Sequence, residues 1–383
     1  MTKIIEQPQL DFDDVLIVPQ RSTLTSRSEI TLERTFSFYH SPRTWTGIPI
    51  MCANMSFCSF EMAKALARHK IIACLHKYHT VAQLTDYFNQ YPENIDYSFV
   101  SIGYKKSDLN HLLELKNIIN KQPNICIDVP NGHMDVFVKY CKRVRDHFPE
   151  SIIIAGNVTN TSSTQELLIY GGVDIVKAGI GGGSACTTRF ATGCGIPQLS
   201  CCLENSYVAH GLQNGPKKLG LICSDGGHKN SGDVCKALCA GADFVMLGGY
   251  FAGCDEAEGE WQYEHRRAIV DNNGKILQEW WQPIDPGYHP PEKRKTQFTY
   301  YGMSTHHTQE KYEDTIKAYR ASEGTKITVK YKGTIDKIIQ ELLGGIRSCC
   351  CYIGASHIKH MIKCGQFCKV SKVHSNSNPT LGV

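Results

Sequence analysis

The sequence lacks the long apolar segments that insert a protein into a membrane or direct it out of the cell. No stretch of the 383 residues reaches the run of about 18 apolar residues that a membrane span requires. Residues 1–20 contain no apolar core of a signal peptide, and acidic side chains already occur at Asp11, Asp13 and Asp14. We therefore expect a cytosolic protein with no membrane partner.

A strong excess of charge of either sign is also missing. The formal net charge is +4, the basic residues are scattered, and no basic stripe interleaved with aromatic residues occurs. Nucleic-acid binding relies on clustered Lys and Arg side chains that neutralise phosphates, so no nucleic-acid partner is expected. A small molecule that carries a phosphate remains compatible with this balance.

Cysteine is abundant, but the spacing of a zinc site is absent. The 18 cysteines include adjacent residues at Cys201–Cys202 and 349–351, not pairs separated by two residues. Many others lie inside apolar runs such as IPIMCAN and NICIDV, where a reduced thiol behaves as a small hydrophobic group. This favours a reducing compartment over a secreted disulfide scaffold. A structural metal protein rich in cysteine stays as an alternative, which stoichiometric zinc in the purified protein would reveal.

Eight short apolar runs predict parallel strands that are buried on both faces. Each run is continuous, without alternating polar residues. They are residues 48–54, 71–76, 98–103, 124–129, 151–158, 173–179, 219–227 and 244–249.

Amphipathic segments with helical spacing alternate with these strands. Eight strand-then-helix units in succession favour a closed (β/α)8 barrel over an open doubly wound sheet, so we expect a single barrel domain over residues 1–383. The helical patterns are clearest at 60–69, 107–120, 134–148, 164–172 and 232–242.

Residues 255–300 interrupt this alternation. They are rich in charge, aromatic residues and proline, and too irregular for a core, which predicts a surface insertion or a lid over the site. Helical periodicity returns within 306–383, and the polar residues 371–383 are expected to be disordered.

The densest chemical signal is the loop GIGGGSACTTR at residues 179–189, which follows the sixth predicted strand. Its glycines allow positive φ angles and leave backbone groups accessible to a phosphate or a cation. A dinucleotide fingerprint would require glycine at position 184, which is Ser184, and would follow the first strand. Cys186 stands at a strand end of the barrel, where catalytic groups lie, and a thiol is an effective nucleophile near neutral pH. A buried loop cysteine with no chemical role is the alternative reading.

Other candidates follow neighbouring strands. SDGG at 224–227 and LGG at 247–249 end the seventh and eighth strands, where barrels commonly bind phosphate through glycine N–H groups. Lys77 and Asp128 are candidate site residues only because they lie at strand ends. Arg320 and Glu323, after the insertion, are candidates for substrate orientation and proton transfer, although their spacing also fits a solvated helix end.

Together these segments resemble the inosine-monophosphate dehydrogenase and guanosine-monophosphate reductase superfamily. The loop GIGGGSACTTR looks like the cysteine loop of that family, and DFDDVLIVP, SDGG and GADFVMLGG match its other landmarks from about residue 9 to 370. The motifs CTTR, YGMS, YRASEG and GGIRS look like the reductase branch. The short connections leave no room for the regulatory domain pair of most dehydrogenases.

The resemblance implies a reaction. Cys186 would attack C2 of guanosine monophosphate (GMP), ammonia would leave, and a covalent thioimidate would be reduced by NADPH to inosine monophosphate (IMP). Thr188 and Glu323 would handle the protons of the departing ammonia. The family also implies a homotetramer in which residues near the N-terminus and 348–351 act across an interface.

The resemblance also assigns the binding residues. The nucleotide would be held by Asp225, Gly226, Gly227, Gly248, Gly249, Gly302, Met303, Ser304, Arg320, Ala321, Ser322 and Gly324. The cofactor would meet Ser26, Arg27, Lys77, Asp128, Val129, Pro130, Ile180, Gly181, Met303, Tyr319, Arg320, Ser348, Cys349, Cys350 and Cys351. A monovalent cation, K⁺, would be held at Gly181, Gly183, Cys186 and Arg189.

Some positions depart from the family pattern. Gly182 stands where the family usually has proline, Ser56 where it has an acid, and His228, Lys229 and Asn230 follow SDGG. Two other functions stay open. One is an IMP dehydrogenase without the regulatory domain, which would oxidise IMP to xanthosine monophosphate with NAD. The other is a non-catalytic barrel that binds purine nucleotides.

Overall fold

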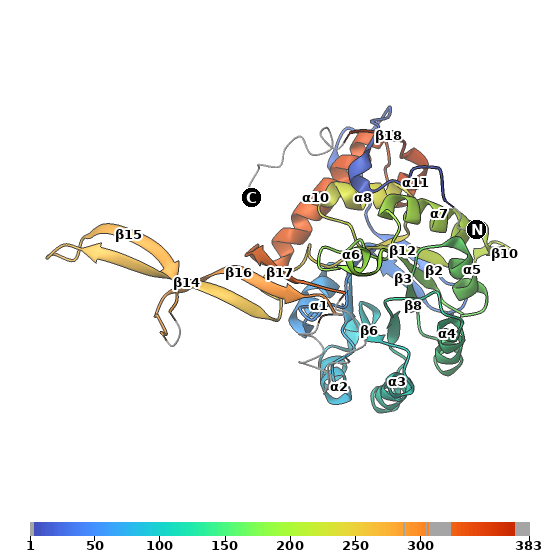
Figure 1. Cartoon of the computed structure of the whole chain (residues 1–383), viewed down its shortest axis with the longest axis horizontal. Helices are drawn as coiled ribbons and strands as arrows, with labels where there is room; N and C mark the ends of the chain where they lie inside the picture. The colour runs from blue at the N-terminus through green and yellow to red at the C-terminus, as the bar shows by residue number, and fades with distance from the viewer. Residues whose placement is uncertain (1–3, 286–287, 304, 306–322, 372–383) are drawn as a thin grey trace.

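Eight parallel strands close into a barrel surrounded by helices (Figure 1). The computed structural model describes residues 4–285, 288–303, 305 and 323–371. The barrel strands are β4 (Ile50–Cys52), β5 (Ile72–Leu75), β6 (Ser98–Ile102), β7 (Asn124–Asp128), β8 (Ile153–Val158), β9 (Ile175–Ala178), β12 (Leu221–Asp225) and β13 (Phe244–Leu247). The barrel closes where β13 pairs with β4, with Val245 opposite Ile50 and Leu247 opposite Cys52. The eight predicted strands and the barrel are confirmed.

Helices follow the strands in the order that the sequence predicts. They are α1 (Phe60–Arg68), α2 (Val81–Gln90), α3 (Lys106–Ile119), α4 (Asp135–His147), α5 (Thr161–Ile169), α6 (Thr188–Thr192), α7 (Gln198–Gly211), α8 (Ser231–Cys239), α10 (Ile335–Ile353) and α11 (Met361–Cys364). Helix α5 begins three residues before the expected 164–172 because the Asn160 side chain caps it by accepting from the Ser163 N–H. The predicted C-terminal helical periodicity corresponds to α10 and α11. No helix in the described ranges is both long and apolar enough to cross a membrane.

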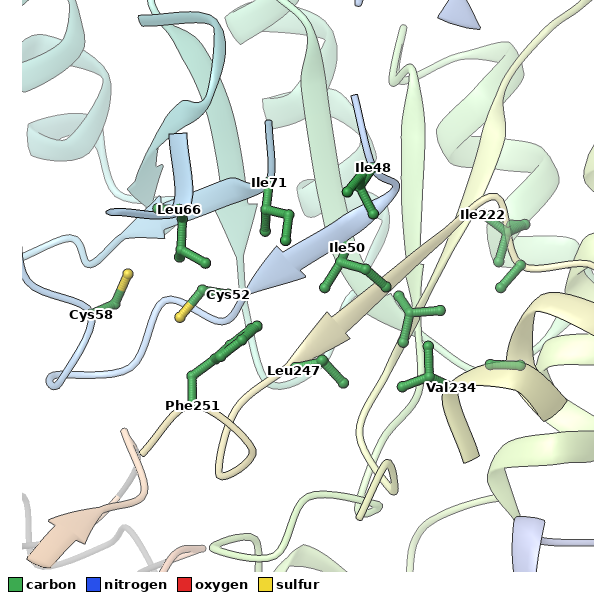
Figure 2. Close-up of a cluster of buried hydrophobic side chains, with 14 of the residues drawn as sticks. Ile48, Ile50, Cys52, Cys58, Leu66, Ile71, Ile222, Val234, Leu247 and Phe251 are labelled. Atoms are coloured by element: carbon green, nitrogen blue, oxygen red, sulfur yellow. The ribbon is translucent and has the colours of Figure 1, made fainter. Parts of the chain in front are cut away.

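The continuous apolar strands are explained by two buried faces. Successive side chains of β4 alternate, with Met51 in the cluster inside the barrel and Ile50 and Cys52 in the cluster beneath the helices. Figure 2 shows Ile50, Cys52 and Leu247 in that outer cluster, with Leu66 of α1 and Phe251 nearby. A run without polar alternation is therefore what a strand inside a ring of helices requires.

A hairpin covers the N-terminal end of the barrel. It consists of β2 (Arg34–Ser37) and β3 (Thr44–Gly47), and its Phe36 and Trp45 rings lie 4.5 and 5.5 Å from the ring of Phe244 at the start of β13. The remaining short elements are η1 (Phe12–Asp14), β1 (Val15–Ile17), η2 (Arg27–Glu29), η3 (Pro92–Asp96), β10 (Gln213–Asn214), β11 (Lys217–Lys218), η4 (Ile358–His360) and β18 (Phe367–Lys369). Strands β1 and β18 pair with each other, so segments near the two ends of the chain meet.

The insertion at residues 255–300, whose sequence predicts irregular structure, instead forms regular antiparallel strands. Its sheet has the order β15–β14–β16–β17, and Figure 1 shows β14 and β15 reaching away from the barrel. The base of this sheet is anchored because Phe298 and Tyr300 pack against Phe57, at ring distances of 6.4 and 5.4 Å. These strands are β14 (Glu260–Val270), β15 (Ile276–Pro283), β16 (Lys293–Tyr301) and β17 (Lys326–Lys330). The expected disordered tail, 371–383, lies outside the described residues except for residue 371.

All 18 cysteines are free thiols, and 12 of them are buried. Cys126 and Cys223 point into the barrel cluster, whereas Cys201 and Cys202 pack between helices and barrel. This confirms that most of these thiols fill apolar space.

Candidate active site

A cavity of about 1010 Å³ opens at the C-terminal ends of the barrel strands. Chemistry on this fold takes place at that end, because the loops after the strands converge there. Its walls include Asn54 after β4, Asp128 at the end of β7 and Asp225 at the end of β12, together with the glycine loop after β9. Strand ends that are far apart in the sequence therefore share one cavity, as predicted.

The glycine loop brings Cys186 to the cavity wall. Gly181 has a φ of 81°, and a Cβ on Gly179 would lie 2.1 Å from the Asp225 carbonyl oxygen, so both positions need glycine. The Cys186 N–H donates to the Gly183 carbonyl at 3.0 Å, which closes a tight turn at the cysteine. The thiol is partly exposed to the cavity, in contrast to the buried packing cysteines.

A chain of hydrogen bonds leads away from the thiol. The Cys186 Sγ donates to Thr188 Oγ1 at 3.2 Å, and Thr188 Oγ1 donates to Glu323 Oε2 at 2.8 Å. The backbone fixes this geometry, because the Thr187 N–H donates to the Glu323 carbonyl at 3.1 Å and the Thr325 N–H donates to the Ala185 carbonyl at 2.9 Å. A thiol, a hydroxyl and a carboxylate 135 residues further along the chain therefore form one hydrogen-bonded chain.

The floor of the cavity carries a buried charge cluster. The Lys177 ammonium bonds to Asp128 Oδ1 and lies 3.2 Å from Asp225 Oδ2. Asn54 donates to Asp128 at 3.0 Å, and Asn157 donates to Asp225 at 2.9 Å. Each carboxylate is thus held by one cation and one amide.

These contacts set the charge states. Burial alone would lower the pKa of Lys177, but Asp128 and Asp225 outweigh it and raise that pKa well above its ordinary value. Burial alone would raise the pKa of Asp128, yet Lys177 lowers it. The cluster consequently holds an ionised Asp128 beside a charged Lys177, and the side-chain oxygens of Asp128 and Asp225 are fixed where they can accept hydrogen bonds from a ligand's hydroxyl or amide groups.

The expected phosphate end lies on the same cavity. Gly226 and Gly227, with φ of 97° and 84°, line it next to Gly248 and Gly249. Glycine N–H groups without side chains are suited to surround a phosphate. Beside them His228 lines the cavity, and burial lowers its pKa to about 4, so its ring is neutral near pH 7.

The expected nucleotide residues Gly302 and Met303 also line the cavity, whereas Gly324 forms an isolated bridge with Cys186 beside it. Four more expected nucleotide residues, Ser304, Arg320, Ala321 and Ser322, lie outside the described residues. Tyr319, which was expected together with Arg320 to meet the cofactor, also lies outside them.

The expected cofactor residues fall into two groups. One group lines the cavity beside Cys186 and extends toward β5 and β7, namely Lys77, Asp128, Val129, Pro130, Ile180, Gly181 and Met303. The other group does not line it and lies on η2 and α10, two elements that contact each other, namely Ser26, Arg27, Ser348, Cys349, Cys350 and Cys351. A cavity of about 1010 Å³ is at the upper end of the range for small-molecule sites, which suits two ligands better than one.

The expected cation residues follow the same loop. Neutral backbone carbonyl oxygens suit K⁺, and each has two lone pairs. The carbonyls of Gly183 and Arg189 each accept one backbone hydrogen bond, from Cys186 and from Gly193, which leaves a second lone pair on each oxygen. The Arg189 side chain is held away from this role by the Ile196 carbonyl at 2.8 Å and by Asp11 at 3.5 Å. A monovalent cation at this loop would be held by backbone carbonyl oxygens, and the Arg189 side chain would take no part.

Lys177 and Tyr300 are two residues of the site that the sequence did not mark. Lys177 lies beneath the cavity residues Asp128 and Asp225 and was counted among the residues of an apolar strand, although a lysine inside a run buried on both faces is itself a signal of a buried ion pair. Tyr300 belongs to the insertion, yet its hydroxyl lies 3.1 Å from Ser184 Oγ and its ring lines the cavity. No local motif marks Tyr300, because only the folded sheet brings it to the glycine loop.

Comparison with known proteins places the chain in a family. The sequence model of the IMP dehydrogenase / GMP reductase domain matches residues 9–276 and 286–378. GMP reductase from Phytophthora infestans is 42% identical over 376 residues, covering 97% of this chain and 93% of that protein. GMP reductase 2 from Homo sapiens is 40% identical over 373 residues, covering 97% of each. GMP reductase from Shewanella pealeana is 39% identical over 379 residues, covering 98% of each. The chain therefore belongs to the IMP dehydrogenase / GMP reductase family.

Proposed function

We propose that this protein is a GMP reductase, an oxidoreductase that converts GMP to IMP and ammonia in purine nucleotide interconversion. The observation that carries the proposal is the hydrogen-bonded path from Cys186 through Thr188 to Glu323 at the cavity wall. The relatives described above are GMP reductases, and this chain matches each of them over nearly its whole length. This similarity supports the same reaction here.

The first half of the reaction uses this path. The thiol proton of Cys186 passes to the Thr188 hydroxyl, whose own proton passes to the Glu323 carboxylate, and the resulting thiolate attacks C2 of the guanine base. Glu323 then returns a proton through Thr188 to the amino group on C2. The C–N bond breaks, ammonia leaves, and a thioimidate joins C2 to Sγ. Protonation is required because an amide ion is a very poor leaving group.

The second half requires a reductant. A bound reduced nicotinamide, which we propose to be NADPH, supplies a hydride to C2. The C–S bond then breaks, which releases IMP and regenerates the Cys186 thiolate. Lys77, Asp128, Val129 and Pro130 line the part of the cavity beyond Cys186 and would orient the dinucleotide there.

The nucleotide itself would lie across the cavity. Gly226, Gly227, Gly248 and Gly249 would bind its phosphate through backbone N–H groups, and Asp225 would accept from ribose hydroxyls. The carboxylate at Asp225 is fixed for this purpose by Lys177 and Asn157. K⁺ bound through the carbonyls of the cysteine loop would hold that loop in the conformation that presents Sγ.

We further propose a cytosolic homotetramer. Ser26, Arg27 and residues 348–351 lie together on η2 and α10, apart from the cavity of their own chain. Such a position supports contact with the cofactor of a neighbouring subunit. The 18 free thiols support a reducing compartment.

The sheet β14–β17 is proposed to act as a lid. Tyr300, Ile327 and Val329 on β16 and β17 line the cavity, so the base of the sheet forms part of its wall. The matched family ranges omit residues 277–285, which fall mainly in β15, so the far end of the sheet is where this chain differs from the family pattern.

The test is a nicotinamide absorbance assay on the purified protein. GMP with NADPH, with and without K⁺, is expected to give loss of absorbance and release of IMP and ammonia. Consumption only with IMP and NAD would replace the proposal by the dehydrogenase reaction. Tight GMP binding without turnover under either condition would indicate a non-catalytic barrel.

A further inference from the structure

A second cavity, of about 740 Å³, lies at the N-terminal end of the barrel. We call it the basal cavity. It is bounded by residues 33–35 of β2, Lys218 of β11, residues 241–243 before β13, and residues 357–363. The same strands β12 and β13 carry Asp225 and Gly248 at their other ends, so the basal cavity and the active-site cavity open at opposite ends of the barrel.

The charges around the basal cavity are unbalanced. Four basic side chains, Arg34, Lys218, Lys359 and Lys363, face two carboxylates, Glu33 and Asp243. Three histidines, His210, His357 and His360, also line the cavity. A concave surface with this excess concentrates an anion.

Both carboxylates already have partners. Asp243 is buried and accepts from Arg34 at 3.0 Å, from His210 at 2.8 Å and from the Ile222 N–H at 3.2 Å. Glu33 pairs at 2.8 Å with Lys70, a residue that does not line the cavity. The direct ion pairs of both carboxylates are therefore made with other groups, and of the remaining cations only Lys218 interacts with Asp243, at longer range.

The remaining cations make no direct ion pair within the described residues. No described ion pair or hydrogen bond involves the ammonium groups of Lys218, Lys359 or Lys363, and Lys218 is half-buried. Burial lowers the pKa of His357, and the positive charges of Lys359, His360 and Arg34 lower it further. The neighbouring charges that act on His357 are thus positive.

The tautomer of His357, which lines the same cavity, is also fixed. Its Nδ1 accepts from the Lys359 N–H at 3.1 Å, so in the neutral ring the proton lies on Nε2. Leu238, Ala242 and Ile358 add apolar wall to the same cavity. The volume is within the range of about 300–1,000 Å³ that is usual for small-molecule sites, and far larger than one phosphate group needs.

We propose that the basal cavity is a second ligand site, which binds a phosphate-bearing small molecule through Lys218, Lys359 and His357. The apolar wall and the volume favour a nucleotide, whereas the cations would also bind an inorganic polyphosphate. The site does not depend on the proposed reaction, because no residue that lines it lines the active-site cavity.

Calorimetric titration of the full-length protein tests this proposal with two probes, tripolyphosphate and ATP. Excess IMP is present so that the active-site cavity is filled. Binding of both probes with similar affinity would identify the phosphates as the recognised part. Much tighter binding of ATP would identify a nucleotide as the ligand. No binding of either probe at millimolar concentration would overturn the proposal.

Two variants locate the site. The double change Lys218→Gln and Lys359→Gln is expected to weaken binding by roughly tenfold or more, since it removes two charge-assisted contacts. Lys217→Gln is the matched control, because Lys217 is the exposed neighbour on β11 and does not line the cavity. Equal affinity of the double variant and the control would overturn the proposal.

Lysine acylation followed by mass spectrometry gives a readout that is independent of IMP. Bound probe is expected to protect Lys218 and Lys359 but not Lys217. Protection confined to Lys77, Lys332 and Lys337, which line the active-site cavity, would show that the probes bind only there and would overturn the proposal.

Discussion

The Thr188 hydroxyl donates a hydrogen bond to the Glu323 carboxylate at 2.8 Å, although 135 residues separate the two. The same hydroxyl accepts from the Cys186 thiol. Glu323→Gln removes the proton acceptor and retains the shape, so GMP reduction is expected to fall by about 10²–10⁴-fold. Steady-state rates of the variant and the native protein measure this loss.

Thr188 provides the control for this path. Thr188→Ser keeps the hydroxyl and should stay within a few-fold of the native rate, whereas Thr188→Val should resemble Glu323→Gln. A Thr188→Val variant with native activity would exclude the hydroxyl from the proton path.

Cys186→Ala should abolish turnover while GMP still binds, because the glycine loops and Asp225 remain. Calorimetric titration of GMP and the absorbance assay separate the two properties. Cys194→Ala is the matched control, since Cys194 is an exposed thiol eight residues further on that does not line the cavity. Residual turnover of Cys186→Ala above that of a reaction without enzyme would contradict a covalent intermediate on this thiol.

Lys177→Met leaves the carboxylates of Asp128 and Asp225 without their shared cation. Removing one partner of a buried ion pair costs about 3–5 kcal/mol, and because both carboxylates are partly open to the cavity we expect about 3 kcal/mol. Urea unfolding at pH 7 measures the free energy of unfolding.

The matched control for this change is Lys142→Met. Lys142 pairs with Asp146 on the exposed face of α4, where an ion pair contributes about 1 kcal/mol or less. Similar losses in the two variants would mean that the charge cluster does not stabilise the fold.

His79 should make the fold sensitive to acid. Burial lowers its pKa from 6.5 to about 4, its ring stacks on His76 at 3.8 Å, and within the described residues its Nε2 has no hydrogen-bond partner. Between pH 6.5 and pH 4 the unfolded chain binds a proton that the folded chain does not, so stability falls as pH falls. His79→Phe should remove about 2 kcal/mol of the loss between pH 7 and pH 5.

Urea unfolding of His79→Phe and native protein at pH 7 and pH 5 tests this, because the difference between them cancels all other titrating groups. His289→Gln, at an exposed histidine, is the control. An unchanged pH dependence in His79→Phe would show that His79 takes up its proton equally in both states.

The lid proposal predicts a separation of activity from stability. Replacing residues 267–279 by a short Gly-Ser linker removes mostly exposed side chains at the far end of β14 and β15. The free energy of unfolding should change little, while turnover should fall. Loss of folding on this deletion would refute a lid and indicate a structural role.

Much of the barrel follows from the sequence because each strand is buried on both faces, which leaves a continuous apolar run. Helices with an amphipathic pattern were similarly predictable, but α2 and α7 were not identified. In α7 the buried residues Gln198, Ser200 and Asn205 are polar, so burial and hydropathy disagree there.

The antiparallel sheet was missed for a different reason. Asn273-Gly274 is a strong hairpin signal, and Gly274 has a φ of 80° at the turn between β14 and β15. The strands on either side are largely exposed on both faces and mix polar and apolar residues on each, so neither apolar alternation nor a continuous run marks them. The position of Cys186 could be predicted from its loop, whereas its distance to Glu323 depends on the whole fold.

The pairing of β1 with β18 sets a time scale for biosynthesis. Val15 leaves the ribosome about 350 residues before its partner Lys369, and at about 5–20 residues per second the wait lasts roughly 20–70 seconds. Barrel closure is also late, because β4 at Ile50 can pair with β13 only after Val245 has been synthesised. The nascent chain therefore exposes apolar strand edges for most of its synthesis, which makes this protein a natural client for chaperones that bind at the ribosome.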